Sequence, residues 1–220
     1  DLYIEKDSSI NDEIDRMRLS ATSALLERDD VIVVATVSCI YGLGNPESFR
    51  DMRLAFTKGS EANIQDAVRQ LVTLQYERND VVLERGKFRV KGDVLEVYPA
   101  YLKEAFRIEY EWDQVDRIRR FNPVSGEITG EPEGMTVYPA KHFVMPERQI
   151  HDALGKIRDE LTIRYEELQS QGKLLEAQRI KSRTEYDLEM MEELGYCPGI
   201  ENYSRLLSGR EKGERPAVLL

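Results

Sequence analysis

The hydrophobic period of this chain changes twice along its length, and the two changes limit the folds it can adopt. From about Val81 to Thr129, apolar and polar residues alternate with a period of two, most clearly in the runs 88–91 and 106–109. Such alternation is typical of antiparallel strands with one buried and one solvated face. Before and after this stretch, apolar residues recur every three or four positions, as in amphipathic helices. The pattern therefore predicts an antiparallel sheet domain inserted between two helix-containing segments.

The segment before the sheet predicts an α/β arrangement. One helical stripe is formed by Ile10, Ile14, Met17, Ala21 and Leu25. The run 31–37 is β-branched with almost no alternation, which suits a parallel strand that helices bury on both faces. Helix, apolar strand and glycine-containing loop, in this order, belong to an α/β sheet. A further helical stripe, closer to the predicted antiparallel sheet, is formed by Ile64, Val68, Leu71 and Leu74.

The segment after Pro146 predicts two long helices joined by a tight turn. The first stripe ends at Gly172 and consists of Ile150, Leu154, Ile157, Leu161 and Leu168. The second ends at Gly195 and consists of Ala177, Ile180, Thr184, Leu188 and Met191. Two such helices form an αα-hairpin. The chain is therefore expected to divide into an α/β part at 1–50, an inserted α+β domain at 51–145, and a helical subdomain at 146–220 that ends in the start of a strand.

The acidic balance of the chain argues against a broad nucleic-acid surface. One third of its 220 residues are charged and its formal net charge is −10, so on average it repels a phosphate backbone. Cys39 and Cys197 lie far apart in apolar contexts, which predicts two reduced, buried thiols. With His142 and His151 they form no spacing known for zinc. No run of roughly 18 apolar residues and no secretory leader is found, so we predict a cytoplasmic protein without a membrane partner.

The sequence contains no nucleotide-hydrolysing motif. The three Gly-Lys pairs, at 86–87, 155–156 and 172–173, are followed by Phe, Ile or Leu. A P-loop requires Ser or Thr there, because that hydroxyl binds magnesium. No Asp-Glu pair stands at the end of an apolar strand, where a Walker B carboxylate belongs. We therefore expect no catalytic residue, no metal site and no ATP hydrolysis by this chain alone.

Five runs of residues carry a resemblance to a known family. They are 3–7, 37–44, 173–179, 186–191 and 199–205. Through these runs the chain resembles the UvrB family, the helicase-like subunits of bacterial nucleotide excision repair, in unbroken order over essentially all 220 residues. The resemblance implies a partial RecA-like helicase domain, an inserted antiparallel sheet domain and a helical subdomain. It also implies an internal piece of a longer protein, with the ATP and magnesium sites outside this chain.

One face of the predicted sheet is the candidate docking surface. Period two places four charged side chains together on the outer side, opposite the apolar positions: Arg89, Lys91, Arg107 and Glu109. Such a face can be merely solubilising, but arginines that pair with carboxylates are favoured at protein interfaces. The resemblance implies that these four residues and Arg78 bind UvrA, the damage-sensing ATPase subunit. Lys91 stands where the family is expected to carry arginine, which removes a planar fork from that contact.

A second set of residues is implied by the resemblance to contact DNA. Tyr3 and Lys6 resemble the returning strand of the β-hairpin that tests DNA for lesions, where an aromatic ring would stack on bases. Ser38 and Arg18 resemble backbone contacts of the helicase part. Arg183 and Glu201 resemble DNA-proximal positions of the helical subdomain, although surface charges on helices are an equal alternative for both.

Taken together, the residues and the resemblance predict a central fragment of a damage-verification subunit. It would dock onto UvrA through the inserted sheet domain and, in the full-length protein, act on damaged double-stranded DNA before incision by UvrC. Two alternatives stay open. One is the UvrB-like module of a transcription–repair coupling factor, against which the runs 186–191 and 201–205 speak. The other is an autonomous DNA-binding or helicase fragment.

Overall fold

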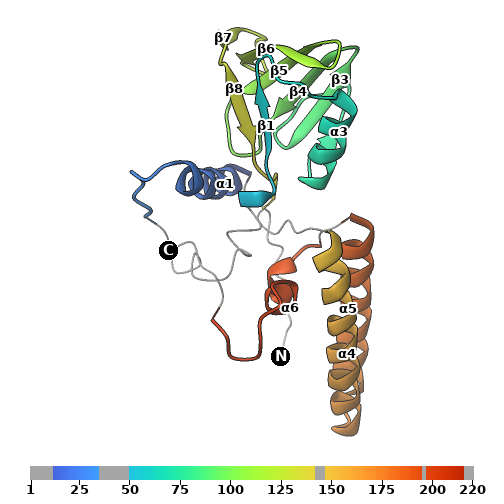
Figure 1. Ribbon diagram of the computed structural model, residues 1–220. Coiled ribbons are helices and arrows are strands. Elements are labelled where there is room, and N and C mark those ends of the chain that lie inside the picture. Colours follow the sequence, from blue (N-terminus) through green and yellow to red (C-terminus); the bar gives the residue numbers. More distant parts are fainter. Residues whose placement is uncertain (1–11, 35–49, 142–146, 195–196, 216–220) are drawn as a thin grey trace.

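The alternating segment forms a six-stranded sheet in the computed structural model of the chain (Figure 1). The structure describes residues 12–34, 50–141, 147–194 and 197–215. In space the strands follow the order β2-β3-β4-β5-β6-β7, and all neighbours are antiparallel except β2 and β3. Their bounds are β2 Glu77–Arg78, β3 Lys87–Lys91, β4 Val94–Tyr98, β5 Ala105–Glu111, β6 Gln114–Phe121 and β7 Ile128–Gly130. The predicted antiparallel sheet is thus confirmed.

A second, two-stranded sheet closes the domain. It pairs β1, Leu54–Thr57, with β8, Gly134–Val137, so the first and last strands of the domain lie side by side. Helix α3, Ile64–Thr73, follows β1. Its N-cap is Asn63, whose side-chain oxygen accepts a hydrogen bond from the backbone N–H of Gln65 at 2.9 Å, which satisfies a donor that the first turn leaves free. The helix predicted from the stripe 64–74 is confirmed.

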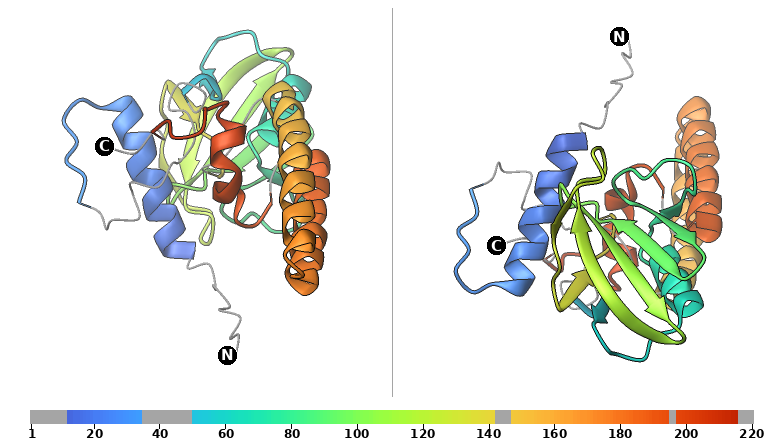
Figure 2. Two further views of the ribbon diagram at one scale, coloured as in Figure 1. Left: turned by 90° about the horizontal axis from the view of Figure 1, so that it is seen from below. Right: turned by 90° about the horizontal axis from the view of Figure 1, so that it is seen from above.

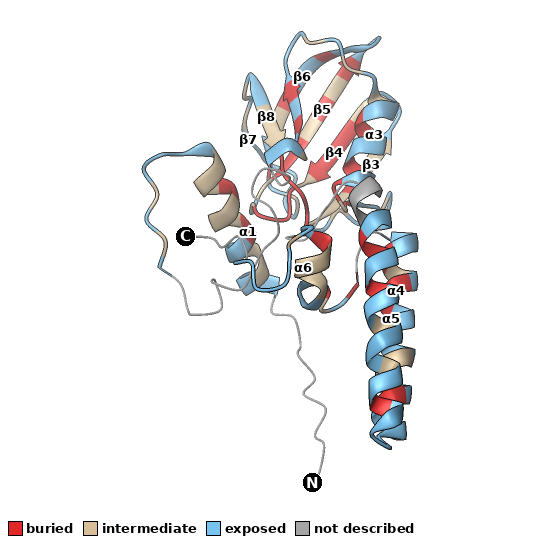
Figure 3. Cartoon of the chain, turned by 60° about the horizontal axis from the view of Figure 1, so that its bottom comes forward, coloured by how far each residue is buried: buried red, intermediate tan, exposed pale blue. Residues whose placement is uncertain are grey.

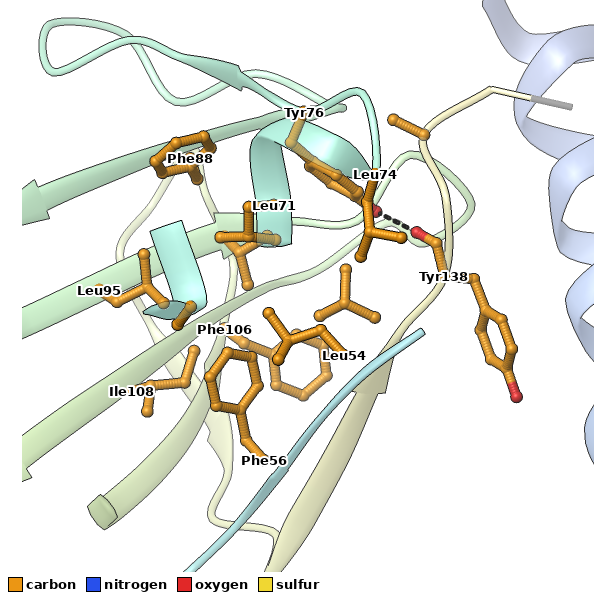
Figure 4. Packing of buried hydrophobic residues seen from close by; sticks show 14 of the residues in the cluster. Leu54, Phe56, Leu71, Leu74, Tyr76, Phe88, Leu95, Phe106, Ile108 and Tyr138 are labelled. Atoms are coloured by element: carbon orange, nitrogen blue, oxygen red, sulfur yellow. Dashed lines mark hydrogen bonds between the residues drawn. The ribbon is translucent and has the colours of Figure 1, made fainter. Parts of the chain in front are cut away.

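The main core lies between the inner face of the six-stranded sheet, the small sheet and α3. Figure 4 shows Phe88, Leu95 and Ile108 from the sheet packed near Leu71 of α3, and all four are fully buried. The Tyr76 hydroxyl, a polar group buried in this core, is hydrogen-bonded because it donates to the Tyr138 carbonyl at 3.0 Å (Figure 4).

Helix α1, Asp12–Glu27, adds to the same core through Leu19, which is 1 % exposed. This corrects the predicted stripe, because Ile14 and Met17 are 46 % and 50 % exposed. The helix exists where it was predicted, but it meets the sheet domain with a different face. Figure 1 and Figure 2 show α1 on one side of the molecule and the two long helices on the other.

The predicted αα-hairpin is confirmed. It consists of α4, Glu147–Ser170, and α5, Leu174–Leu194, which turn at Gly172 with a φ of 74°. Short elements η2, Ile200–Tyr203, and α6, Ser204–Leu207, pack against the hairpin. Figure 3 shows that the buried residues of the hairpin form a stripe, with exposed residues around it. A second core forms there from Ala153, Leu154, Ile157, Leu188, Met191, Cys197, Ile200 and Leu207.

The mixed α/β and α+β content is therefore as predicted, but one predicted element is wrong. Residues 31–34 of the expected parallel strand form no regular structure, and Ile32 and Val34 are 92 % and 96 % exposed. A strand needs a neighbour to hydrogen-bond with, and none of the described strands pairs with this run. Residues 35–37 of that prediction lie outside the described residues.

Candidate functional site: the outer face of the sheet

The charged residues predicted to share one face do share it. Phe88, Leu95 and Ile108 face the core. The residues directly before and after each of them along its strand therefore project to the other side of the sheet. We call this surface the outer face and define it by Arg89, Lys91, Glu96, Arg107 and Glu109. In the strand register, Arg89 lies opposite Glu96 and Glu96 lies opposite Arg107, so three charged side chains form one row across β3, β4 and β5.

The centre of this row is a buried carboxylate. Glu96 is only 5 % exposed. Its Oε1 accepts a hydrogen bond from Arg107 Nε at 2.7 Å, and its Oε2 accepts one from Arg89 Nε. A buried carboxylate is costly unless it is paired and hydrogen-bonded, and here both oxygens are occupied. The arrangement holds the two guanidinium groups in fixed positions on the outer face.

Sequence reasoning missed Glu96. A glutamate at a period-two position of a solvated face reads as one more solubilising charge. The signal that could have found it is its register: the turn at Gly92 and Asp93 sets β3 against β4, which brings Glu96 opposite Arg89. Finding its second partner also requires the pairing of β4 with β5, which the longer connection between these strands does not fix.

The outer face continues toward β6. The Arg107 guanidinium lies over the Phe121 ring, 5.2 Å from its centroid, and Phe121 is 3 % exposed although it lies outside the main core cluster. Such stacking is attractive because the ring face is electron-rich. Glu109 pairs with Arg119 at 3.3 Å, and Arg119 also lies 3.5 Å from a Glu131 carboxylate oxygen. The face thus presents linked charges rather than independent ones.

Lys91 lies at the edge of this face, and Arg78 lies on the neighbouring strand β2. Lys91 is exposed at the end of β3. Arg78 pairs with Asp80 at 3.1 Å, and Asp80 accepts a hydrogen bond from the backbone of Val90 at 3.2 Å. These interactions, with the Arg78 hydrogen bond first, lower the pKa of the Asp80 carboxyl. In the register Arg78 aligns with Phe88, which faces the core. Arg78 therefore does not belong to the row of Arg89.

The predicted DNA contacts do not form one site in the described part of the chain. Arg18 is exposed on α1, and this helix lies on a different side of the molecule from the hairpin (Figure 2). Arg183 and Glu201 are both exposed in the helical unit, where Arg183 lies 3.8 Å from Asp187. Tyr3, Lys6 and Ser38 lie outside the described residues. Only Arg183 and Glu201 therefore lie in the same unit.

The Arg183 side of the helical unit is a packed polar corner. The Tyr203 hydroxyl donates to Asp187 Oδ2 at 2.7 Å, and Asp187 is 5 % exposed. Burial, followed by this hydrogen bond, raises the pKa of Tyr203 to about 12. Cys197 beside them is a buried free thiol, as predicted, and burial raises its pKa to about 12. Within the described ranges, no group of histidine, cysteine and acidic residues could hold a metal ion, and no helix is long and apolar enough to cross a membrane.

The fold and this face define a class of protein in which a small sheet domain presents a row of paired charges and is followed by an αα-hairpin domain. Known families match the two units separately. The UvrB interaction domain matches residues 54–143, and the UvrB third helical domain matches residues 148–209. The chain belongs to the UvrB family.

Curated relatives agree over the whole chain. It is 62 % identical over 219 residues to UvrABC system protein B of Treponema denticola, and 62 % identical over 220 residues to that of Treponema pallidum. It is 56 % identical over 220 residues to UvrABC system protein B of Gemmatimonas aurantiaca. All of this chain is covered in each case, but only 33 %, 33 % and 31 % of those proteins. The chain thus spans about a third of the length of the curated relatives it matches.

Proposed function

We propose that this chain is the part of a nucleotide excision repair subunit that docks onto UvrA, and that it does so through the outer face. The observation that carries the proposal is the Arg89–Glu96–Arg107 row. Two arginines are held in place by one buried carboxylate, so little side-chain entropy remains to be lost when a partner binds. Pre-oriented guanidinium groups recognise carboxylates in two-pronged pairs. The partner surface is therefore expected to be acidic.

The remaining features of the proposed function rest on the relatives and on the resemblance. Damage verification on double-stranded DNA, delivery to UvrC, and the use of ATP and magnesium would be properties of the longer protein. Arg183 and Glu201, with Arg18, Ser38, Tyr3 and Lys6, would line the DNA path in that protein, which would act in the cytoplasm. The chain itself would contribute binding rather than catalysis. The transcription–repair coupling factor is not favoured, because the UvrB third helical domain follows the interaction domain here.

A calorimetric titration with UvrA tests the proposal. The test variant is Arg89→Ala/Arg107→Ala, which removes two charges from the outer face. The control variant, Arg69→Ala/Arg164→Ala, also removes two exposed arginines that each pair with a carboxylate three residues away. We expect wild type and control to bind equally and the outer-face variant to lose binding while circular dichroism shows it folded. Absence of binding by folded wild type would refute the proposal.

A further inference from the structure

The turn between β5 and β6 displays the single tryptophan of the chain in solvent. Trp112 is 93 % exposed and has a φ of 57°. A left-handed backbone is uncommon for a residue with a bulky side chain. A large aromatic ring left in water contributes almost no burial energy to its own fold. Folding therefore does not account for tryptophan at this position.

The turn that carries this ring is held firmly. The Asp113 carbonyl accepts a hydrogen bond from the Ala62 N–H at 2.9 Å, and Asp113 Oδ1 accepts one from Asn63 Nδ2 at 3.0 Å. The Val115 carbonyl accepts another from the Gly59 N–H at 2.7 Å. The segment 59–63 follows β1, which points away from α4 and α5 in Figure 1. The ring thus stands on a fixed base at the end of the domain remote from the hairpin.

The surroundings of the ring are acidic. The hollow beside it is lined by Glu61, Ala62, Asn63, Glu111, Asp113 and Gln114. Its three carboxylates are exposed, and none of its lining residues is a cation. An electron-rich ring among carboxylates attracts a guanidinium or ammonium group and repels a phosphate backbone. The occupant this surface fits is an arginine or lysine side chain of a protein.

The hollow adjoins β5, one of the strands of the outer face, through Glu111. Arg107, Glu109 and Glu111 alternate along the same side of β5, and Trp112 follows immediately. At protein interfaces, tryptophan and arginine are the residues that contribute most of the binding energy. We propose that Trp112 is an aromatic anchor that receives a basic side chain of the protein docking on the outer face. This inference rests on the proposed function. It predicts that UvrA carries a basic side chain beside the acidic patch expected to meet the outer face.

Fluorine NMR on the full chain tests the anchor directly. The chain has one tryptophan, so incorporation of 5-fluorotryptophan gives a single resonance, and with unlabelled UvrA this resonance reports on residue 112 alone. The test variants are Trp112→Ala and Trp112→Phe. The control is Val124→Ala, which truncates another apolar residue, 95 % exposed, in the turn between β6 and β7.

We expect the resonance to shift on addition of UvrA and Trp112→Ala to weaken binding roughly tenfold, with a smaller loss for Trp112→Phe and none for Val124→Ala. The anchor would be overturned, with UvrA docking left intact, if Trp112→Ala binds as wild type does and the wild-type resonance does not move on addition of UvrA, while Arg89→Ala/Arg107→Ala still abolishes binding. A resonance that shifts only with the concentration of the chain itself would overturn it too, by assigning the ring to self-association. Absence of UvrA binding by wild type would remove both proposals.

Discussion

A glutamate on the wet side of a sheet is normally hydrated, but Glu96 is 5 % exposed because Arg89 and Arg107 close over it from both neighbouring strands. The Glu96 carboxylate fixes the two arginines, so the structure of the outer face depends on the negative charge of Glu96. If it is neutralised, two guanidinium groups face each other without a counter-charge. At the scale of single residues, Glu96 therefore links the stability of the sheet to the shape of its candidate docking surface.

Replacing Glu96 with glutamine keeps its size and removes its charge. We expect Glu96→Gln to lower the free energy of unfolding by about 1–3 kcal/mol, because two partly buried arginines lose their counter-charge. UvrA affinity should fall as well, because the arginines are no longer held. Urea unfolding measures the first effect. Glu84→Gln is the control, since Glu84 pairs with Lys87 at an exposed site and should change stability little. Equal stability of the two variants would contradict the assigned role.

The Tyr110 hydroxyl differs from the Glu96 carboxylate, because it is a buried polar group without a hydrogen bond among the described residues. It is buried and finds no hydrogen-bond partner in the part of the chain that the structure describes, and burial raises its pKa to about 12. Removing an unsatisfied buried polar group is favourable, so Tyr110→Phe should raise the free energy of unfolding by about 1 kcal/mol. Tyr76→Phe is the matched control, because the Tyr76 hydroxyl does have a partner, and it should lower stability by about 1 kcal/mol. Chemical denaturation of both variants measures these changes. A lower free energy of unfolding for Tyr110→Phe would indicate that its hydroxyl does have a hydrogen-bond partner.

At the scale of elements, the αα-hairpin places two glycines in opposite roles. Gly155 lies within α4 and Gly172 is the left-handed residue between the helices, and an added Cβ would have open space at either position. The difference between them is therefore purely a matter of backbone conformation. The hairpin needs glycine at the turn and only tolerates it in the helix.

The same substitution should therefore have opposite signs at the two positions. Gly155→Ala should stabilise by about 1 kcal/mol, because alanine favours the helix. Gly172→Ala should destabilise by about 1 kcal/mol, because its φ of 74° is unfavourable for any residue with a Cβ. Thermal unfolding monitored at a helical wavelength compares the two. A gain in both variants would mean that the turn relaxes away from the left-handed conformation.

The free energy of unfolding of the helical part should fall at alkaline pH, because the second core buries the Cys197 thiol. The Cys197 thiol has its ordinary pKa of 9.0 in the unfolded chain and about 12 when buried. A group whose pKa is raised by folding contributes stability that is complete below the unfolded pKa and is lost as pH rises toward the folded one. Between pH 9 and 12, Cys197→Ala should therefore lose less stability than wild type, by up to about 1.4 kcal/mol per pH unit. Parallel curves would exclude the thiol as a source of the loss.

At the scale of the whole molecule, the distribution of charge favours docking onto a protein over autonomous binding to DNA. The formal net charge is −10, while Arg89 and Arg107 of the outer face are both paired with Glu96. Helix α1, which carries Arg18, and helix α5, which carries Arg183, lie on different sides of the molecule (Figure 2). We therefore do not expect these two arginines to bind one short stretch of DNA backbone together.

We accordingly expect no saturable binding to a damaged duplex at about 0.15 M salt, up to roughly 100 µM chain. Fluorescence anisotropy with a labelled duplex measures this, with an undamaged duplex as the control. Arg183→Ala should leave the result unchanged. Saturable binding that Arg183→Ala weakens would instead favour the autonomous DNA-binding alternative.

The local sequence determined the strands of the sheet with their buried and exposed sides, and the two long helices. Period two placed Phe88 and Ile108 inside and Arg89 and Arg107 outside, and the period of three to four residues gave the hairpin, because both patterns depend only on neighbouring residues. Tertiary structure decided the rest. It paired β1 with β8 across the domain and buried Glu96 between two arginines. It also left Trp112 in solvent and residues 31–34 without a sheet partner. These outcomes depend on contacts between segments far apart in the chain, which hydrophobic periodicity does not encode.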